Sequence, residues 1–136
     1  MIDFRAYEKF SDPIFRVSLS LIFIIGGLGH FGRHEMMLQR VETSPWFDLV
    51  SSLGQPSFFL YLSGIVFCIA GVGLMLGLFT RLSALALFLT LIPITFVIHI
   101  APDHTGPLFK NVAILGGLVH FMVRGGGWCS LSKYSH

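Results

Sequence analysis

The chain has 136 residues, of which 54% are hydrophobic and only 12% are charged. Soluble domains carry about 25% charged residues, and a soluble fold of this size could not bury so much apolar surface. The formal net charge of +2 comes without a run of basic residues, which argues against nucleic acid as a partner. The composition therefore predicts an integral membrane protein, with the lipid bilayer as its first partner.

The apolar residues fall into four runs, each long enough to cross about 30 Å of hydrocarbon as a helix. Asp12 followed by Pro13 is typical of a helix start and predicts the beginning of the first run. Short connections between the later runs predict antiparallel neighbours, so the expected fold is all-α, a four-helix membrane bundle with up-and-down topology. We expect residues 1–136 to form one such domain, with spans at about 13–31, 57–79, 82–100 and 108–123.

Three further features predict local structure. Residues 32–56 are polar with aromatic residues interspersed, which predicts one or two short amphipathic turns along the headgroup region. Gly73 and Gly77 form a small-xxx-small pair, which predicts close packing of the second span against another helix. Pro93 inside the third span predicts a kink, because proline frees a backbone carbonyl.

Basic residues are distributed unevenly between the two ends of the predicted spans. Cytoplasmic loops are enriched in Lys and Arg, so the richer end is expected in the cytoplasm. This places both termini in the cytoplasm, in a bacterial-type inner membrane. Arg16, one turn into the first span, is expected to snorkel to the cytoplasmic surface. The richer end has Arg5, Lys9, Arg16, Arg81, Arg124 and Lys133, and the poorer end has Arg33, Arg40 and Lys110.

Four of the six histidines gather at the end opposite the termini. His30 and His34 are spaced i,i+4 at the end of the first span, and His99 and His104 surround the end of the third. Histidines with neighbouring carboxylates could bind a transition metal, and a facing pair could hold haem. They could also exchange protons during quinone chemistry. The alternative is that they only bond to loop carbonyls at the membrane interface.

His120 lies several turns inside the fourth span, on one helical stripe with Ala113, Gly117 and Arg124. A polar side chain within a span normally faces the bundle interior and finds a partner there. His120 is therefore expected either to hydrogen-bond across helices or to line a pocket.

Several motifs, taken in order, resemble the DoxX/DoxD family of small four-helix membrane proteins. The resemblance runs from roughly residue 14 to 132 and is looser in the first half. Phe67, His30 and Ser132 depart from it, since members often have glutamate, lysine and aspartate there. The matching pieces are GVGLMLGLFTRLSAL (Gly71 to Leu85), His99 at the end of span three, Lys110-Asn111 followed by VAILGGL, and the closing Gly125, Gly127, Ser130 and Leu131.

The resemblance implies a membrane subunit of a redox system, because a DoxD-type subunit belongs to a thiosulfate:quinone oxidoreductase. It implies a quinone-linked, sulfur-related role, with partner subunits or a homo-oligomer, and it leaves open whether this chain itself catalyses a reaction. The alternatives are a non-catalytic accessory or scaffold subunit, and transport of a small solute or metal ion. The candidate residues are His99, His30 and Asn111 for catalysis, His99, His120 and Arg81 for a cofactor such as quinone, and His30, His34, His99 and His104 for a metal.

Overall fold

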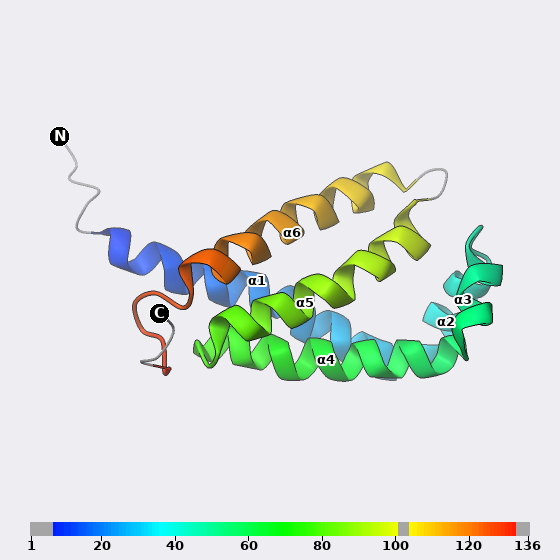
Figure 1. The fold of residues 1–136 in the computed structure, drawn as a ribbon, viewed down its shortest axis with the longest axis horizontal. Coiled ribbons are helices and arrows are strands. Elements are labelled where there is room, and N and C mark those ends of the chain that lie inside the picture. The colour runs from blue at the N-terminus through cyan, green and yellow to red at the C-terminus, as the bar shows by residue number, and fades with distance from the viewer. Residues whose placement is uncertain (1–6, 101–103, 133–136) are drawn as a thin grey trace.

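A computed structural model describes residues 7–100 and 104–132, so that Arg5 and Lys133, which contribute to the expected orientation, lie outside the described residues. Four helical segments in this part of the chain are long and apolar enough to cross a membrane. They run alternately in opposite directions (Figure 1), which confirms the predicted all-α membrane bundle. These segments are α1 (Glu8–Gly32), α4 (Pro56–Leu76), α5 (Thr80–Ile94) continued by the π-helical turn η2 (Thr95–His99), and α6 (Thr105–Arg124).

Two short helices, α2 (His34–Glu42) and α3 (Phe47–Leu53), lie at the end of the bundle farthest from the termini (Figure 1). Neither contains a buried residue. The expectation of short helical turns within residues 32–56 is thus confirmed. We call this end of the bundle the α2–α3 end, and the end that carries the first residues of α1 and the last residues of α6 the terminal end.

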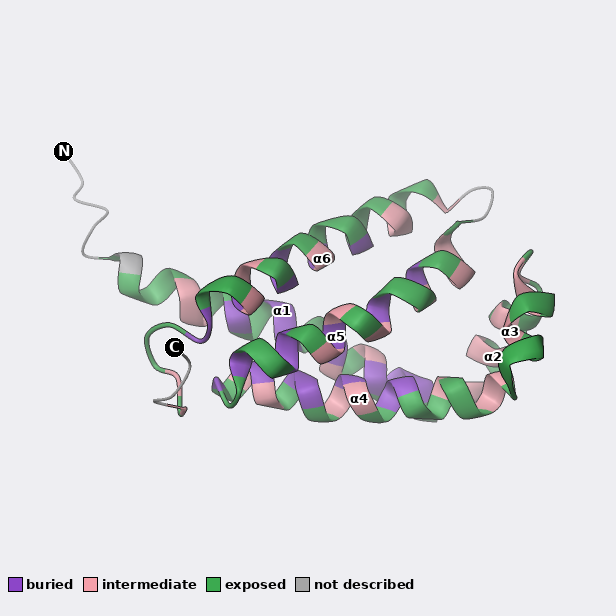
Figure 2. Ribbon diagram, in the orientation of Figure 1, coloured by how far each residue is buried: buried purple, intermediate pink, exposed green. Residues whose placement is uncertain are grey.

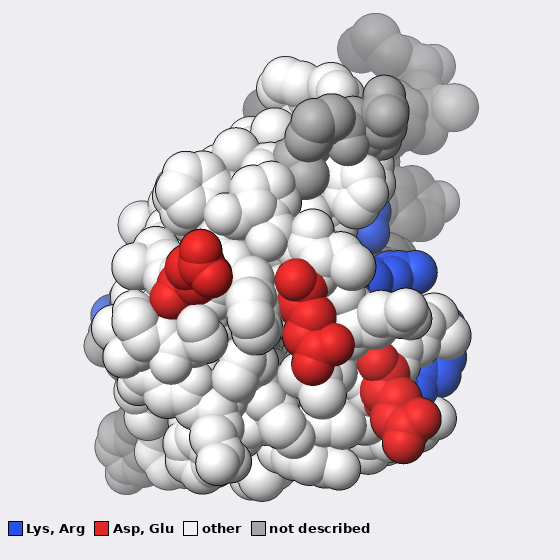
Figure 3. Space-filling model, turned by 90° about the vertical axis from the view of Figure 1, so that its right-hand side faces the viewer, with Lys and Arg blue, Asp and Glu red and all other residues white. Residues whose placement is uncertain are grey.

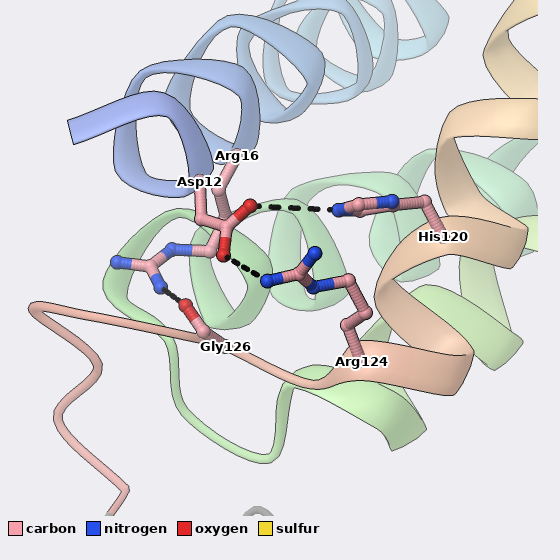
Figure 4. A network of polar contacts seen from close by, with 5 residues as sticks. All are labelled: Asp12, Arg16, His120, Arg124 and Gly126. Atoms are coloured by element: carbon pink, nitrogen blue, oxygen red, sulfur yellow. Dashed lines mark hydrogen bonds and ion pairs between the residues drawn. The ribbon is translucent and has the colours of Figure 1, made fainter. Parts of the chain in front are cut away.

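The predicted start of the first helix is wrong. Helix α1 begins at Glu8, and Pro13 lies inside it. Asp12 does not cap the helix, because its carboxylate turns toward α6 and lies 3.6 Å from Nε2 of His120 and 3.5 Å from Nη2 of Arg124 (Figure 4). An ion pair to another helix therefore replaces the expected local hydrogen bond.

The second span is shorter than predicted. Helix α4 ends at Leu76, and Gly77 follows as a left-handed cap with φ 71°. Residues with a Cβ avoid this conformation, which explains a glycine there. Gly77 therefore ends the helix rather than packing within it, whereas Gly73 does allow close packing: a Cβ on it would lie 2.6 Å from Oγ of Ser83 on α5.

The fourth span begins earlier than predicted, at Thr105 rather than at about residue 108. Gly106 and Pro107 suggested a turn, but both fit in the first turn of α6. The amide groups of a first turn have no helical acceptor, so a proline there loses no hydrogen bond.

Apolar side chains fill the space between the four spans, and the buried positions follow the inward faces of the helices (Figure 2). The outward faces are also apolar: Ile25, Ile69 and Leu82 are each more than 60% exposed. Such a surface fits hydrocarbon rather than water. The largest apolar side chains that are fully buried are those of Phe23, Leu74, Leu87, Leu118 and Phe121.

Arg16 does not snorkel to the surface, contrary to expectation; it is only 2% exposed. Its guanidinium donates to three backbone carbonyls: Nε to Met75 (3.3 Å), Nη1 to Gly126 and Nη2 to Cys129 (3.0 Å). Figure 4 shows it beside Asp12, reaching the segment that follows α6. Carbonyls at the end of a helix lack helical donors, and a membrane interior supplies none. One arginine thus joins α1, the end of α4 and the C-terminal segment.

The segment after α6 also pairs directly with the end of α4. The amide of Leu131 donates to the carbonyl of Leu76, and the amide of Ser132 to that of Gly77, both at 3.2 Å. The hydroxyl of Ser130 donates to the same Gly77 carbonyl at 2.6 Å. The C-terminal segment is therefore part of the folded terminal end.

We predict that Arg16→Gln lowers the free energy of unfolding by about 3–5 kcal/mol, because hydrogen bonds from a buried charged donor are lost and carbonyls are left unpaired. Unfolding of the purified chain in mixed micelles of increasing denaturing detergent would measure the change. Arg81→Gln is the matched control: Arg81 is exposed and donates to the carbonyl of Val123. Its loss should cost less than about 1 kcal/mol. Equal effects of the two changes would contradict the anchoring role of Arg16.

We also predict that Gly27→Ala destabilises the α1–α4 contact by about 1–3 kcal/mol. A Cβ on Gly27 would lie 2.8 Å from Sγ of Cys68 and 2.9 Å from the carbonyl oxygen of Gly64, so the helices would have to separate. Gly116→Ala is the control, since nothing lies within 4 Å of its added methyl group. The same detergent titration should leave that variant unchanged or slightly more stable.

Candidate functional site

The third span changes its helical geometry just after Pro93. The α-helix ends at Ile94 and continues as the wider π-helical turn η2, from Thr95 to His99. The predicted irregularity at Pro93 thus takes the form of a π turn. Such turns are rare and frequently occur at functional sites. Thr95 and His99 are the first and last residues of this turn.

A buried hydrogen-bonded pair joins η2 to α6. Asn111 is 4% exposed, and its Nδ2 donates to Oγ1 of Thr95 at 2.9 Å. The Thr95 hydroxyl in turn donates to the carbonyl of Leu91 at 2.7 Å. These two hydrogen bonds link the Asn111 amide to the Thr95 hydroxyl and hold both side chains in place.

His99 is the last residue of η2, four residues after Thr95. Its Nδ1 is buried and has no hydrogen-bond partner among the described residues. The ring centre is 5.9 Å from that of His104, whose Nδ1 donates to the carbonyl of Ile98 at 3.0 Å. Lys110 and Arg40 also interact electrostatically with His99. His99 therefore combines an unpaired buried nitrogen with a basic environment.

Two other buried polar atoms lack a hydrogen bond in the described part of the chain, but neither resembles the His99 site. The hydroxyl of Thr80 belongs to a residue that is completely buried, which leaves no access for a ligand. Nε2 of His120 faces the Asp12 carboxylate at 3.6 Å and so has an electrostatic partner. His99 is partly exposed, so a ligand could reach its ring.

The connection between α2 and α3 closes over η2. The hydroxyl of Ser44 donates to the carbonyl of Val97 at 2.5 Å, and Nε1 of Trp46 donates to that of Ile100 at 3.2 Å. The Trp46 ring also packs on Phe96, with ring centres 4.4 Å apart. These contacts place α2 beside η2, which explains how Arg40 comes near His99.

The other predicted pair, His30 and His34, contacts α4. Nδ1 of His30 lies 3.1 Å from the carbonyl of Leu60 and 2.9 Å from the Ser63 hydroxyl, so it must carry a hydrogen. Nδ1 of His34 donates to the carbonyl of His30 at 3.2 Å, and Nε2 lies 2.8 Å from the Ser57 hydroxyl. Both nitrogens of His34 are therefore occupied, and the pair fastens α1 and α2 to α4.

The metal interpretation gains no support from this arrangement. Across residues 7–100 and 104–132, no group of three or more His, Cys, Asp or Glu side chains could hold a metal ion. His30 and His34 bond to α1 and α4, whereas His99 and His104 pack on each other.

The remaining candidates, His120 and Arg81, lie at the terminal end. His120 faces α1: its ring packs 5.6 Å from that of Phe15 and its Nε2 approaches Asp12 (Figure 4). Arg81 donates to the carbonyl of Val123, so it ties α5 to α6. Neither shares a site with His99.

Sequence reasoning did not select Thr95 or Arg40. Thr95 could have been noticed as a hydroxyl four residues before His99 within an otherwise apolar span. Arg40 has no such signal, because its approach to His99 depends on how the polar segment folds back over η2.

Comparison with known proteins decides the family. The family model of DoxX matches residues 12–100, about two thirds of the chain. The chain belongs to the DoxX family. Searches of curated proteins and of solved structures returned no match. The match includes His99, whereas Asn111 and the closing glycine and serine residues lie beyond it. Within this DoxX chain the departure Phe67 is a core residue, 6% exposed, whose ring packs against Phe23 and His30.

We predict that Thr95→Val destabilises the protein by about 1–3 kcal/mol, because the buried amide of Asn111 loses its acceptor. Adding Asn111→Leu should recover part of this loss, since both polar partners are then replaced by apolar groups. A double-mutant cycle from detergent-induced unfolding would measure the coupling. Additive losses would show that the two side chains do not depend on each other.

Proposed function

We propose that this DoxX protein is a quinone-binding subunit of a membrane redox complex. The observation that carries the proposal is the buried, unpaired Nδ1 of His99, four residues after Thr95, whose hydroxyl accepts a hydrogen bond from the buried amide of Asn111. A buried polar atom without a partner costs about 1–3 kcal/mol, so a bound ligand with a matching group would be stabilised there. A quinone has carbonyl oxygens that accept hydrogen bonds, and a ring and tail that dissolve in lipid.

The surroundings of His99 suit the chemistry that a quinone supplies, which is the uptake of electrons and protons at its carbonyl oxygens. Lys110 and Arg40 bring positive charge toward His99. Positive charge stabilises an oxygen as it gains electron density. In this proposal His99 orients the head group and exchanges a proton with it, and Asn111 is a second contact.

In this proposal a partner subunit provides the electrons. The family resemblance implies reduced sulfur compounds as the electron source of such a complex. The bias in basic residues supports an inner-membrane protein with cytoplasmic termini, which places His99 near the outer surface.

A non-catalytic accessory subunit is the second candidate. Gly116 on α6 is exposed, and nothing lies within 4 Å of an added Cβ, so another transmembrane helix could approach closely there. Transport by one copy is less well supported. In the described part of the chain, the buried apolar side chains of Phe23, Leu87 and Leu118 separate the polar groups of the two ends.

We predict that His99→Ala lowers the quinone content of the purified protein, and its affinity for an added short-tail quinone, at least tenfold, as expected for one lost charge-assisted or buried hydrogen bond. Quinone extracted from protein in mild detergent would be quantified by mass spectrometry. In His99→Gln the side-chain amide still provides a hydrogen-bond donor, although at a different position, so this variant should keep part of the affinity for quinone.

His120→Ala is the matched control, because His120 is also partly buried in a span but lies at the terminal end. It should retain quinone as the unmodified chain does. If His99→Ala, His99→Gln and His120→Ala all retain as much quinone as the unmodified chain, the quinone proposal is wrong. A stable complex with another protein and no quinone on this chain would favour the accessory role.

A further inference from the structure

A shallow cavity of about 370 Å³ opens where α1 ends and α2 begins. Its volume lies within the range of sites for small ligands. It does not include His99 or Asn111, and the quinone proposal does not use it. The residues around it are Phe31 to Met36, at the junction of the two helices, and Tyr61 of α4.

Three rings form one wall of the cavity. The ring of His34 stacks on Tyr61 at 3.9 Å with planes 12° apart, and Phe31 stacks on Tyr61 at 6.0 Å with planes 28° apart. His34 is fixed through both nitrogens, to the carbonyl of His30 and the hydroxyl of Ser57. The rings of Phe31 and Tyr61 are about 40% exposed. Exposed aromatic faces attract cations, including ammonium groups.

Two opposite charges border the cavity without neutralising each other. Arg33 and Glu35 are exposed, and within the described ranges neither forms an ion pair or a side-chain hydrogen bond. A guanidinium is well suited to a phosphate group, and a carboxylate to an ammonium group. The cavity therefore suits a ligand that carries both charges close together.

The position of the cavity indicates that this ligand has an apolar tail. The first membrane-crossing segment ends at Gly32, at the level of the cavity. Leu28 and Ile65, one turn from Phe31 and Tyr61 toward the middle of the membrane, are 59% and 46% exposed. They continue the aromatic wall as an apolar track that acyl chains could follow while the head group occupies the cavity.

The charge of the surrounding surface distinguishes between classes of lipid. Figure 3 shows acidic side chains spread over the α2–α3 end. Glu35, Glu42 and Asp48 are exposed on the two short helices there. The basic side chains of Arg33 and Arg40 are exposed at the same end, so this surface presents charges of both signs. A zwitterionic head group, which also carries both signs of charge, fits such a surface.

We propose that this cavity binds the head group of a zwitterionic phospholipid. Arg33 contacts the phosphate, and Glu35 contacts the ammonium group together with the faces of Phe31 and Tyr61. The site lies on α1, α2 and α4 and is independent of the quinone site between η2 and α6.

Native mass spectrometry of the full chain in micelles with equal amounts of phosphatidylethanolamine and phosphatidylglycerol tests the proposal. The unmodified chain should retain about fivefold more phosphatidylethanolamine. Glu35→Gln should remove this preference and leave phosphatidylglycerol retention unchanged. Arg33→Gln should lower the retention of both lipids. Glu42→Gln, an exposed position of α2 outside the cavity, should behave as the unmodified chain.

Three results would overturn the proposal. The first is equal retention of the two lipids by the unmodified chain. The second is an Arg33 or Glu35 variant that retains lipid as the unmodified chain does. The third is displacement of the lipid by glycerophosphoethanolamine at a similar concentration, which would assign the cavity to a soluble ligand instead. Quinone content can be measured in the same samples, so a failure here is distinguishable from a failure of the quinone proposal.

Discussion

The buried guanidinium of Arg16 is the interaction on which the rest of the structure depends. A charged donor inside a membrane protein is tolerable only when its hydrogen bonds are satisfied, and Arg16 satisfies them with three carbonyls from two distant parts of the chain. It thereby joins the start of the first span, the end of the second and the segment after the last. The neighbouring Asp12 adds contacts to α6, so the first, second and fourth spans are positioned relative to one another at the terminal end.

The first and last spans contact each other at the terminal end, away from the candidate sites. The contacts of α1 with α6 involve Asp12 and Phe15 on one side and His120, Phe121 and Arg124 on the other, all in the terminal half. Toward the α2–α3 end, α6 rises away from α4 (Figure 1). At that end the link between α2 and α3 donates hydrogen bonds to the carbonyls of Val97 in η2 and of Ile100 just after it. Side chains of η2 are thus partly accessible while remaining within the bundle.

The number and type of the spans could be predicted because membrane helices must be long and apolar, and that pattern is local. The predictions for Asp12 and Arg16 were wrong for a shared reason. The role of each residue was inferred from the residues next to it in the sequence, whereas its partners in the fold are more than 50 residues away along the chain. The candidate site was predicted in part. His99 and Asn111 were selected, but the separation of His30 from His99 depends on how residues 33–55 fold back over the bundle, which no local pattern specifies.

Solid-state NMR of the chain labelled with ¹⁵N at histidine and loaded with a quinone ¹³C-labelled at its carbonyl carbons tests the central claim most directly. The account predicts a through-space contact between one carbonyl carbon and Nδ1 of a single histidine, and predicts that His99→Gln removes this signal. A contact with any other histidine, or no contact with a histidine in a quinone-loaded sample, would contradict the assignment of His99 to the quinone site.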